Sequence, residues 1–214
     1  MLTTSRDVEV NMAAATTRFI GSLSPLRLTK PLLSLSAINS NYHRLYSSKR
    51  KIQVGDTLPD VNLYEGSPDN PILASELYKG KKGVLFAVLG AFTPGCTNTH
   101  IPDYLSLYEK FKEEGYMISC VSVNDPYVMK AWGISTNAAG KIRMLADPRG
   151  EFTKALGMEI DCKQVLGGIR SQKYSLVIDD GKILSINVEP EHTGLTCLLC
   201  IKNMKADDAV LQNG

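Results

Sequence analysis

One uninterrupted apolar segment, residues 83–89 (GVLFAVL), constrains the fold of this chain more than any other feature. It is rich in residues that favour strands and lies between the charged pair Lys81-Lys82 and Gly90, which predicts a strand buried on both faces. Extended through Phe92, the apolar stretch reaches ten residues. A membrane-spanning helix needs about 20, so we expect a soluble chain with no membrane partner.

The hydrophobic period changes after this strand. Residues at helical spacing, followed by a glycine suited to a helix C-terminus, predict a helix through Tyr104, Leu107, Tyr108, Phe111 and Gly115. Further patterns predict strands at 116–123, 142–146, 173–178 and 183–188, and helices at 127–137, 151–156 and 195–204. Alternating strands and helices that end in a hairpin are typical of α/β proteins. We expect a thioredoxin-like sandwich with a central mixed β-sheet flanked by helices.

Short polar motifs mark the ends of several of these elements. Asn124-Asp125-Pro126 and Asp147-Pro148 each place a capping side chain before a proline, which favours a helix start at both points. Asp180-Gly181 lies between two alternating segments and predicts a tight turn between paired strands.

The first fifty residues differ in charge from the rest of the chain. Residues 1–50 hold seven basic and two acidic residues, whereas residues 51–214 hold 17 basic and 20 acidic ones. Residues 10–55 contain no Asp or Glu and are rich in Ser, Thr, Arg and Leu. This composition is typical of an organelle transit peptide. We therefore expect residues 1–50 to be a disordered mitochondrial transit peptide and residues 51–214 to form the thioredoxin-like domain.

The pattern of the leader favours the mitochondrial matrix over secretion. Its leucines are interrupted by Ser24, Arg27 and Lys30, so it lacks the apolar core of a secretory signal. Arg44-Leu45-Tyr46-Ser47 resembles a mitochondrial processing site. A basic disordered tail without a targeting role, and an additional cytoplasmic form, stay open. The slightly acidic remainder of the chain indicates no nucleic-acid partner.

Cys96 is the cysteine whose position most strongly indicates reactivity. It lies between the buried strand and the helix that follows, so its sulfur is expected in the first helical turn, where unpaired N–H groups and the helix dipole stabilise a thiolate. Thr93 could hydrogen-bond the sulfur, and Pro94 could fix the turn. A small buried residue at a helix start is the alternative. For His100, structural support is favoured over a general-base role.

The other four cysteines indicate no metal site and no disulfide framework, because the total of five is odd and no secretory signal is present. Cys120 is expected to be a buried, inert strand residue, and the exposure of Cys162 stays open. Cys197 and Cys200 form a C-x-x-C pair with only His192 nearby, which is too few ligands for zinc. One of the two is the simplest partner for the helix-start cysteine, and a dithiol centre is the alternative.

The segment Gly90-Ala-Phe-Thr-Pro-Gly-Cys96, with Thr99-His100, resembles the peroxidatic loop of peroxiredoxins of the type-five, or atypical two-Cys, branch and its plant type-two relatives. The resemblance extends through the motifs Lys81-Lys-Gly-Val-Leu-Phe, Val121-Ser-Val-Asn-Asp-Pro, Ala131-Trp132-Gly133, Leu145-Ala-Asp-Pro, Tyr174-Ser-Leu-Val-Ile, Asn187-Val-Glu-Pro and Thr193-Gly-Leu-Thr-Cys197. It does not include the first fifty residues or those after about residue 203.

This resemblance implies a thiol peroxidase acting on hydrogen peroxide and alkyl hydroperoxides without a cofactor or metal. Cys96 would be the peroxidatic cysteine, oxidised to a sulfenic acid. Cys197 would be the resolving cysteine of the same chain, forming a disulfide that thioredoxin reduces. Thr93 and Pro94 would shape the pocket. The expected assembly is a monomer or weak homodimer.

Three departures from the family pattern bear on the activity. Lys173 stands where the family has an arginine beside the thiolate, so we expect the lowered pKa of Cys96 to survive and turnover to fall, unless Arg170 reaches the site. Leu89 replaces a proline before the loop and could loosen it. Cys200 could compete with Cys197. Two further functions stay open: a redox sensor with weak turnover, and a dithiol oxidoreductase using the C-x-x-C pair.

Overall fold

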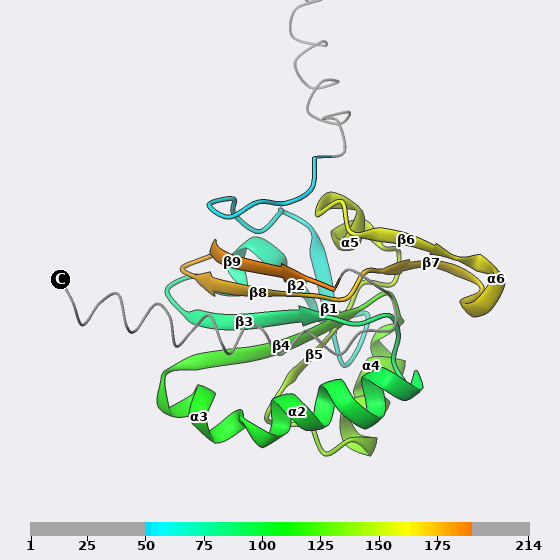
Figure 1. Cartoon of the computed structure of the whole chain (residues 1–214), viewed down its shortest axis with the longest axis horizontal. Coiled ribbons are helices and arrows are strands. Elements are labelled where there is room, and N and C mark those ends of the chain that lie inside the picture. Colours follow the sequence, from blue (N-terminus) through cyan, green and yellow to red (C-terminus); the bar gives the residue numbers. More distant parts are fainter. Residues whose placement is uncertain (1–49, 190–214) are drawn as a thin grey trace, which may run out of the picture. The chain divides into compact units, whose positions relative to one another are not determined.

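The computed structural model describes residues 50–189, which form a mixed seven-stranded sheet and a separate two-stranded sheet. The strand order of the large sheet is β2-β1-β5-β4-β3-β8-β9 (Figure 1). Its strands are β1 (Asn62–Glu65), β2 (Pro71–Leu73), β3 (Lys82–Ala87), β4 (Tyr116–Ser122), β5 (Arg143–Ala146), β8 (Tyr174–Asp179) and β9 (Lys182–Val188). β3, β4 and β5 are parallel, and all other neighbouring pairs are antiparallel. The predicted α/β class with a central mixed sheet is confirmed.

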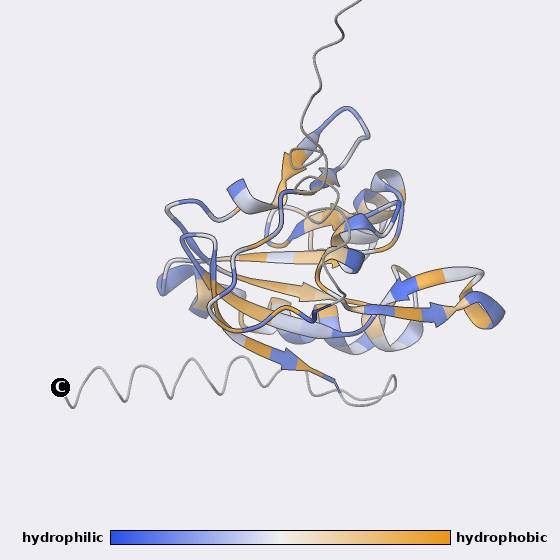
Figure 2. Cartoon of the chain, turned by 90° about the horizontal axis from the view of Figure 1, so that it is seen from above, coloured by the Kyte–Doolittle hydropathy of each residue, from blue (hydrophilic) through white to orange (hydrophobic). Residues whose placement is uncertain are grey.

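The helices of the described residues lie on both faces of the large sheet. Their bounds are η1 (Ala74–Glu76), η2 (Cys96–His100), α2 (Ile101–Ser106), α3 (Tyr108–Glu113), α4 (Pro126–Ser135), α5 (Glu151–Ala155) and α6 (Lys163–Leu166). Val84 and Phe86 of β3 pack in one core with residues of α2, α3 and α4, and Leu85 and Ala87 pack in a second core with residues of α5. β3 is therefore buried on both faces, as its apolar sequence predicts. Figure 2 shows hydrophobic colouring along the central strands.

The capping and turn motifs are confirmed at two of the three points. The Asp125 carboxylate accepts hydrogen bonds of 3.0 Å from two backbone N–H groups at the start of α4, and Pro126 occupies the first helical position. Asp180 and Gly181 both have positive φ, 47° and 75°, as a type I′ hairpin between β8 and β9 requires. The helix predicted at 151–156 is confirmed as α5, but its N-cap position is Gly150 rather than Asp147, although the Asp147 carboxylate still accepts from two N–H groups of α5.

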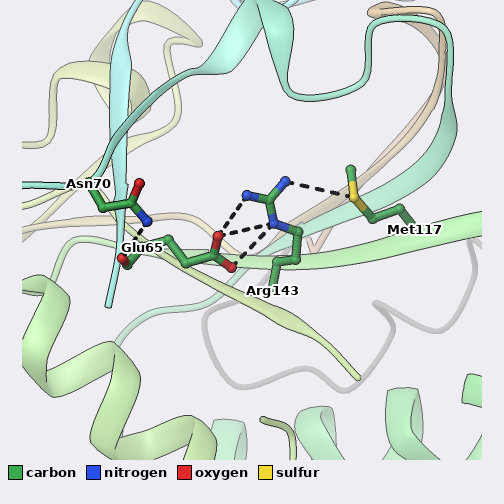
Figure 3. A network of polar contacts seen from close by, with 4 residues as sticks. All are labelled: Glu65, Asn70, Met117 and Arg143. Atoms are coloured by element: carbon green, nitrogen blue, oxygen red, sulfur yellow. Dashed lines mark hydrogen bonds and ion pairs between the residues drawn. The ribbon is translucent and has the colours of Figure 1, made fainter. Parts of the chain in front are cut away.

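Two parts of the fold were absent from the sequence expectations. β1 and β2 extend the sheet beyond β5, and β6 (Glu159–Cys162) pairs with β7 (Gly168–Ser171) in a separate two-stranded sheet that includes α6 at its turn. β1 is joined to β5 by the Arg143 guanidinium, which donates to the Glu65 carboxylate at 2.6 Å and contacts the Met117 sulfur at 3.8 Å (Figure 3). The helix predicted at 195–204 lies outside the described residues.

Candidate active site

Cys96 lies at the start of the helical segment that follows β3, as predicted. The backbone N–H of Thr97 donates to the Thr93 carbonyl at 2.9 Å, so helical hydrogen bonding begins just ahead of η2. Pro94 is exposed and lies in this first turn. The backbone N–H of Ile101 bonds to the Cys96 carbonyl, five residues earlier, which makes this turn a π turn. Such turns are rare and occur often at functional sites. Cys96 itself is 1% exposed.

One hydrogen bond ties the loop before Cys96 to the end of the neighbouring strand β4. The Asn124 side-chain oxygen, two residues after β4, accepts from the Ala91 backbone N–H at 2.9 Å and is itself oriented by the Ser122 hydroxyl, which donates to it at 2.7 Å. Phe92 has a φ of 60°, which is costly for a residue with a side chain and occurs mostly where surrounding contacts impose it. Sequence reasoning assigned Asn124 to a cap only, because its contact with the loop depends on β4 lying beside β3.

Three groups around the Cys96 sulfur determine its acidity. Burial raises the pKa of the thiol, but hydrogen bonds from His100 and Thr93, the charge of His100 and the Leu89 backbone together lower it below its ordinary value. The Thr93 hydroxyl donates to the Gly90 carbonyl at 2.8 Å. A hydroxyl has one hydrogen, so this donor cannot serve the carbonyl and the sulfur at the same time.

Behind Cys96 lies a buried cluster of one carboxylate and two basic side chains. Glu189 Oε1 is 3.4 Å from His100 Nε2, and Glu189 Oε2 is 3.5 Å from Lys173 Nζ. The three side chains are 2%, 3% and 7% exposed. Glu189 was missed by sequence reasoning. The signal that could have found it is topological: once β8 and β9 are placed beside β3, Lys173 and Glu189 lie at the edge of the sheet where the Cys96 loop begins.

Arg170 lies beside the loop but is held by backbone carbonyls. Its Nη1 donates to the Val123 carbonyl at 2.7 Å and its Nη2 to the Leu166 carbonyl at 3.1 Å. Nη1 would be 3.6 Å from a Cβ atom added at Gly90. The charged group of Arg170 therefore borders the loop that precedes Cys96, and two of its donors are already used.

The remaining cysteines are placed as follows. Cys120 is fully buried in β4, as expected, and Cys162 is half-buried at the end of β6. Cys197 and Cys200 lie outside the described residues. Within residues 50–189, no cluster of three or more His, Cys, Asp or Glu side chains could bind a metal ion. No helix in that range is long and apolar enough to span a membrane.

Comparisons with known proteins show what the chain as a whole is similar to. A family model described as Redoxin matches residues 53–206. Peroxiredoxin-2E, chloroplastic, of Arabidopsis thaliana is 36% identical over 194 residues, which cover 83% of this chain and 83% of that protein.

Solved structures show the same similarity. Peroxiredoxin 5 from Alvinella pompejana is 54% identical and superposes with a TM-score of 0.64. The match covers 71% of this chain and 99% of that protein's chain. Reduced Prx3 from Vibrio vulnificus, solved in complex with H₂O₂, is 44% identical, with 70% and 98% coverage and a TM-score of 0.63.

Proposed function

Because this chain belongs to the peroxiredoxin family and is of the peroxiredoxin 5 type, we propose that it reduces hydrogen peroxide and alkyl hydroperoxides through Cys96. Thiol peroxidase activity follows from the family. The observation that supports Cys96 as the reactive group is its place at a helix start, with a pKa lowered despite burial. The hydrogen-peroxide complex of the Vibrio vulnificus relative supports the smaller substrate.

The proposed chemistry begins with the Cys96 thiolate. Its sulfur attacks one peroxide oxygen, the O–O bond breaks, and sulfur is oxidised to a sulfenic acid while the peroxide is reduced. The departing oxygen leaves with the electron pair and takes up a proton, giving water or an alcohol. Thr93, which hydrogen-bonds the sulfur, would donate its hydroxyl hydrogen to the sulfur or to a peroxide oxygen, and the exposed Pro94 would shape the pocket.

Resolution would use a second cysteine of the same chain. We expect the Cys197 thiol to condense with the Cys96 sulfenic acid, forming a disulfide and releasing water, and thioredoxin to reduce that disulfide by thiol exchange. The resemblance of Thr193-Gly-Leu-Thr-Cys197 to the type-five branch supports this choice. Cys200 is the competing candidate for the same step.

Residues 1–50 are proposed to direct the chain to the mitochondrial matrix, with residues 51–214 as the catalytic domain. The absence of acidic residues from 10 to 55 supports an organelle signal, and the Arabidopsis thaliana relative is named as a protein of another organelle, the chloroplast. A fusion of residues 1–50 to a fluorescent reporter tests this proposal. Mitochondrial fluorescence is expected, and a diffuse cytosolic signal would contradict it.

Peptide mapping by mass spectrometry tests the mechanism directly. The reduced full chain is treated with one equivalent of hydrogen peroxide, quenched within seconds and digested. A link between Cys96 and Cys197 is the expected product. A link between Cys197 and Cys200 with free Cys96 would overturn the mechanism, and a Cys96–Cys200 link would exchange the resolving residue. Sulfinic acid at Cys96 without any disulfide would show a reactive thiolate that no cysteine of this chain resolves.

One observation favours a second function, a redox sensor with slow turnover. Lys173, which stands in place of the family arginine, is buried against the Glu189 carboxylate. An ammonium group lacks the planar fork that could bind a carboxylate and a peroxide oxygen together. Slow peroxide consumption together with stable, oxidant-dependent disulfides to other proteins would support this function over the peroxidase.

A further inference from the structure

Acidic and basic side chains alternate among the buried groups behind the reactive cysteine. In spatial order they are the Cys96 sulfur, the His100 ring, the Glu189 carboxylate and the Lys173 ammonium. We propose that Glu189 is a positioning residue that keeps His100 protonated on both ring nitrogens, as an imidazolium cation between the carboxylate and the Cys96 thiolate. This inference rests on the proposed role of Cys96 and assigns a role to a residue outside the peroxide pocket.

Hydrogen-bond chemistry determines the side of the ring that faces Glu189. An ionised carboxylate can only accept hydrogen bonds. His100 Nε2 lies 3.4 Å from Glu189 Oε1, so a bare nitrogen lone pair there would face the negative oxygen. Nε2 must therefore hold a hydrogen for this contact to be favourable.

The Cys96 side of the ring needs a second hydrogen. His100 lowers the pKa of Cys96 through a hydrogen bond and through its charge, and a thiolate, like a carboxylate, offers only lone pairs. A neutral imidazole has one N–H and can serve one of these two anions. With an anion on each side, the ring is a double donor, and a double-donor imidazole is a cation.

The contacts of the free enzyme are loose. Within the described residues, neither buried ring nitrogen of His100 has a hydrogen-bond partner of regular geometry. Catalytic hydrogen bonds are often long in the free protein and tighten when substrate binds. The electrostatic attraction between oppositely charged groups does not need exact alignment at these distances, because its energy falls only as the inverse of distance.

The sheet, rather than the helix, fixes the position of the carboxylate. The backbone N–H of Glu189 donates to the Lys173 carbonyl at 3.0 Å, so the two residues pair just beyond the last rung of β8 and β9. Lys173 neutralises Glu189 from the side away from His100. The charged and titratable groups identified at the ring are thus Cys96 on its own helix, Glu189 at the end of β9 and, behind it, Lys173.

The negative charge of Glu189 also repels the thiolate, and the order of the groups determines which effect is larger. His100 contacts the Glu189 carboxylate and hydrogen-bonds the Cys96 sulfur, so its positive charge acts on both anions at contact distance. A ring that is 3% exposed would shed its second proton without a counter-charge, because burial disfavours the charged form. Glu189 therefore favours the thiolate through His100.

Nitrogen NMR of the full-length reduced protein, with ¹⁵N-labelled histidine, tests this proposal between pH 6 and 9. The chain has three histidines, and His100→Gln identifies the signals of His100. In the wild-type chain we expect both nitrogens of His100 to be protonated wherever Cys96 is a thiolate. In Glu189→Gln the ring should become neutral about one pH unit lower, a tenfold change in proton affinity. A neutral ring beside the wild-type thiolate, or no change in Glu189→Gln, would overturn the proposal.

Two further variants exclude a merely structural effect. Glu189→Gln leaves the buried Lys173 ammonium without its carboxylate, which could disturb folding. The double variant Glu189→Gln/Lys173→Met removes both charges, and we expect the early loss of the His100 proton to persist in it. If the double variant restores the wild-type titration, the proposal is wrong. Glu151→Gln, at an exposed carboxylate paired with Arg149, is the matched control and should leave the His100 signals unchanged.

The same samples separate this inference from the proposed function. The rate of Cys96 alkylation by iodoacetamide, located by peptide mapping, reports the thiolate without any peroxide. Slower alkylation of Glu189→Gln at pH 7 is expected, with partial rescue in Glu189→Asp. If the wild-type ring is an imidazolium but peroxide is not consumed, the peroxidase proposal fails and the role of Glu189 stands. If peroxide is consumed while the ring is neutral, the role of Glu189 fails alone.

Discussion

Two glutamates of the described fold contact cationic groups in contrasting ways. Glu65 accepts three hydrogen bonds from the Arg143 guanidinium, the shortest 2.6 Å, where both side chains are 30% exposed (Figure 3). Glu189 lies 3.4 Å and 3.5 Å from its two partners, where all side chains are almost fully buried. The half-exposed pair thus has the tighter geometry, although a buried pair needs good geometry more to offset desolvation.

This contrast indicates two different roles for a buried or half-buried acid. A tight pair in contact with water stabilises a fold modestly, because solvent already screens both charges. Loose contacts among buried titratable groups leave their protonation free to respond to a neighbour, and such groups cluster at functional sites. Glu65 fixes β1 against β5, whereas Glu189 acts on the charge beside Cys96. The predictions below test this division.

Gly83→Ala should give the largest effect and should confine it to stability. A Cβ atom at residue 83 would overlap the ring of Tyr78 and lie 2.6 Å from the carbonyl oxygen of Met117, whose sulfur contacts Arg143. Tyr78 is fully buried, so its ring cannot move out into solvent. We expect the free energy of unfolding to fall by about 2–3 kcal/mol, measured by urea denaturation. A stability equal to that of the wild type would contradict this packing argument.

His100→Gln should give the next largest effect, on reactivity. The substitution removes the hydrogen bond and charge that lower the pKa of Cys96 and leaves the burial that raises it. The pKa therefore moves up. Because the thiolate predominates only above the pKa, alkylation by iodoacetamide should reach its plateau at higher pH. At pH 7 an increase of one unit slows the reaction about tenfold. An unchanged pH midpoint would show that His100 has no part in thiolate formation.

Glu65→Gln should have a smaller effect and only on stability. The variant keeps the size of the side chain and replaces charge-assisted hydrogen bonds to Arg143 with weaker ones. We expect a loss of about 1 kcal/mol in the free energy of unfolding, since the pair is partly exposed. Urea denaturation measures the loss, and the pH profile of Cys96 alkylation should match the wild type. A shifted pH profile of alkylation would contradict the proposal that Glu65 affects stability alone and only Glu189 affects Cys96.

Sequence reasoning succeeded where short segments determine their own structure. Three features depend only on neighbours in the chain, so local sequence patterns predict them: the apolar strand β3, the Asp125 cap of α4 and the Asp180-Gly181 turn. The same holds for Cys96 at the helix start. β1 and β2, with only four and three residues, contain too few positions for a clear alternation.

The misses near the site have a different cause. Glu189 is a single acidic residue before a proline, in the segment Asn187-Val-Glu-Pro, and this local sequence does not indicate that its side chain is buried. Its burial beside His100 and Lys173 arises because β8 pairs antiparallel with β3, and β9 with β8. Asn124 likewise reaches the loop before Cys96 because β4 is parallel to β3. Long-range strand pairing determines both contacts, and local sequence patterns do not predict the order of strands in a sheet.

Lys173→Arg gives the smallest expected effect and refines the comparison. Arginine keeps the positive charge beside Glu189, so the pH profile of Cys96 alkylation should stay unchanged. Its planar fork offers further donors that could reach a peroxide oxygen while one arm stays on the carboxylate. We expect peroxide turnover to rise about two- to fivefold, less than 1 kcal/mol of barrier, in a coupled assay with thioredoxin. The matched variant Arg170→Lys, at a guanidinium already bound to two carbonyls, should not raise it. Faster turnover with an unchanged pH profile of alkylation would show that the cluster at Glu189 controls thiolate formation separately from peroxide positioning. An unchanged turnover rate would mean that lysine serves this site as well as arginine.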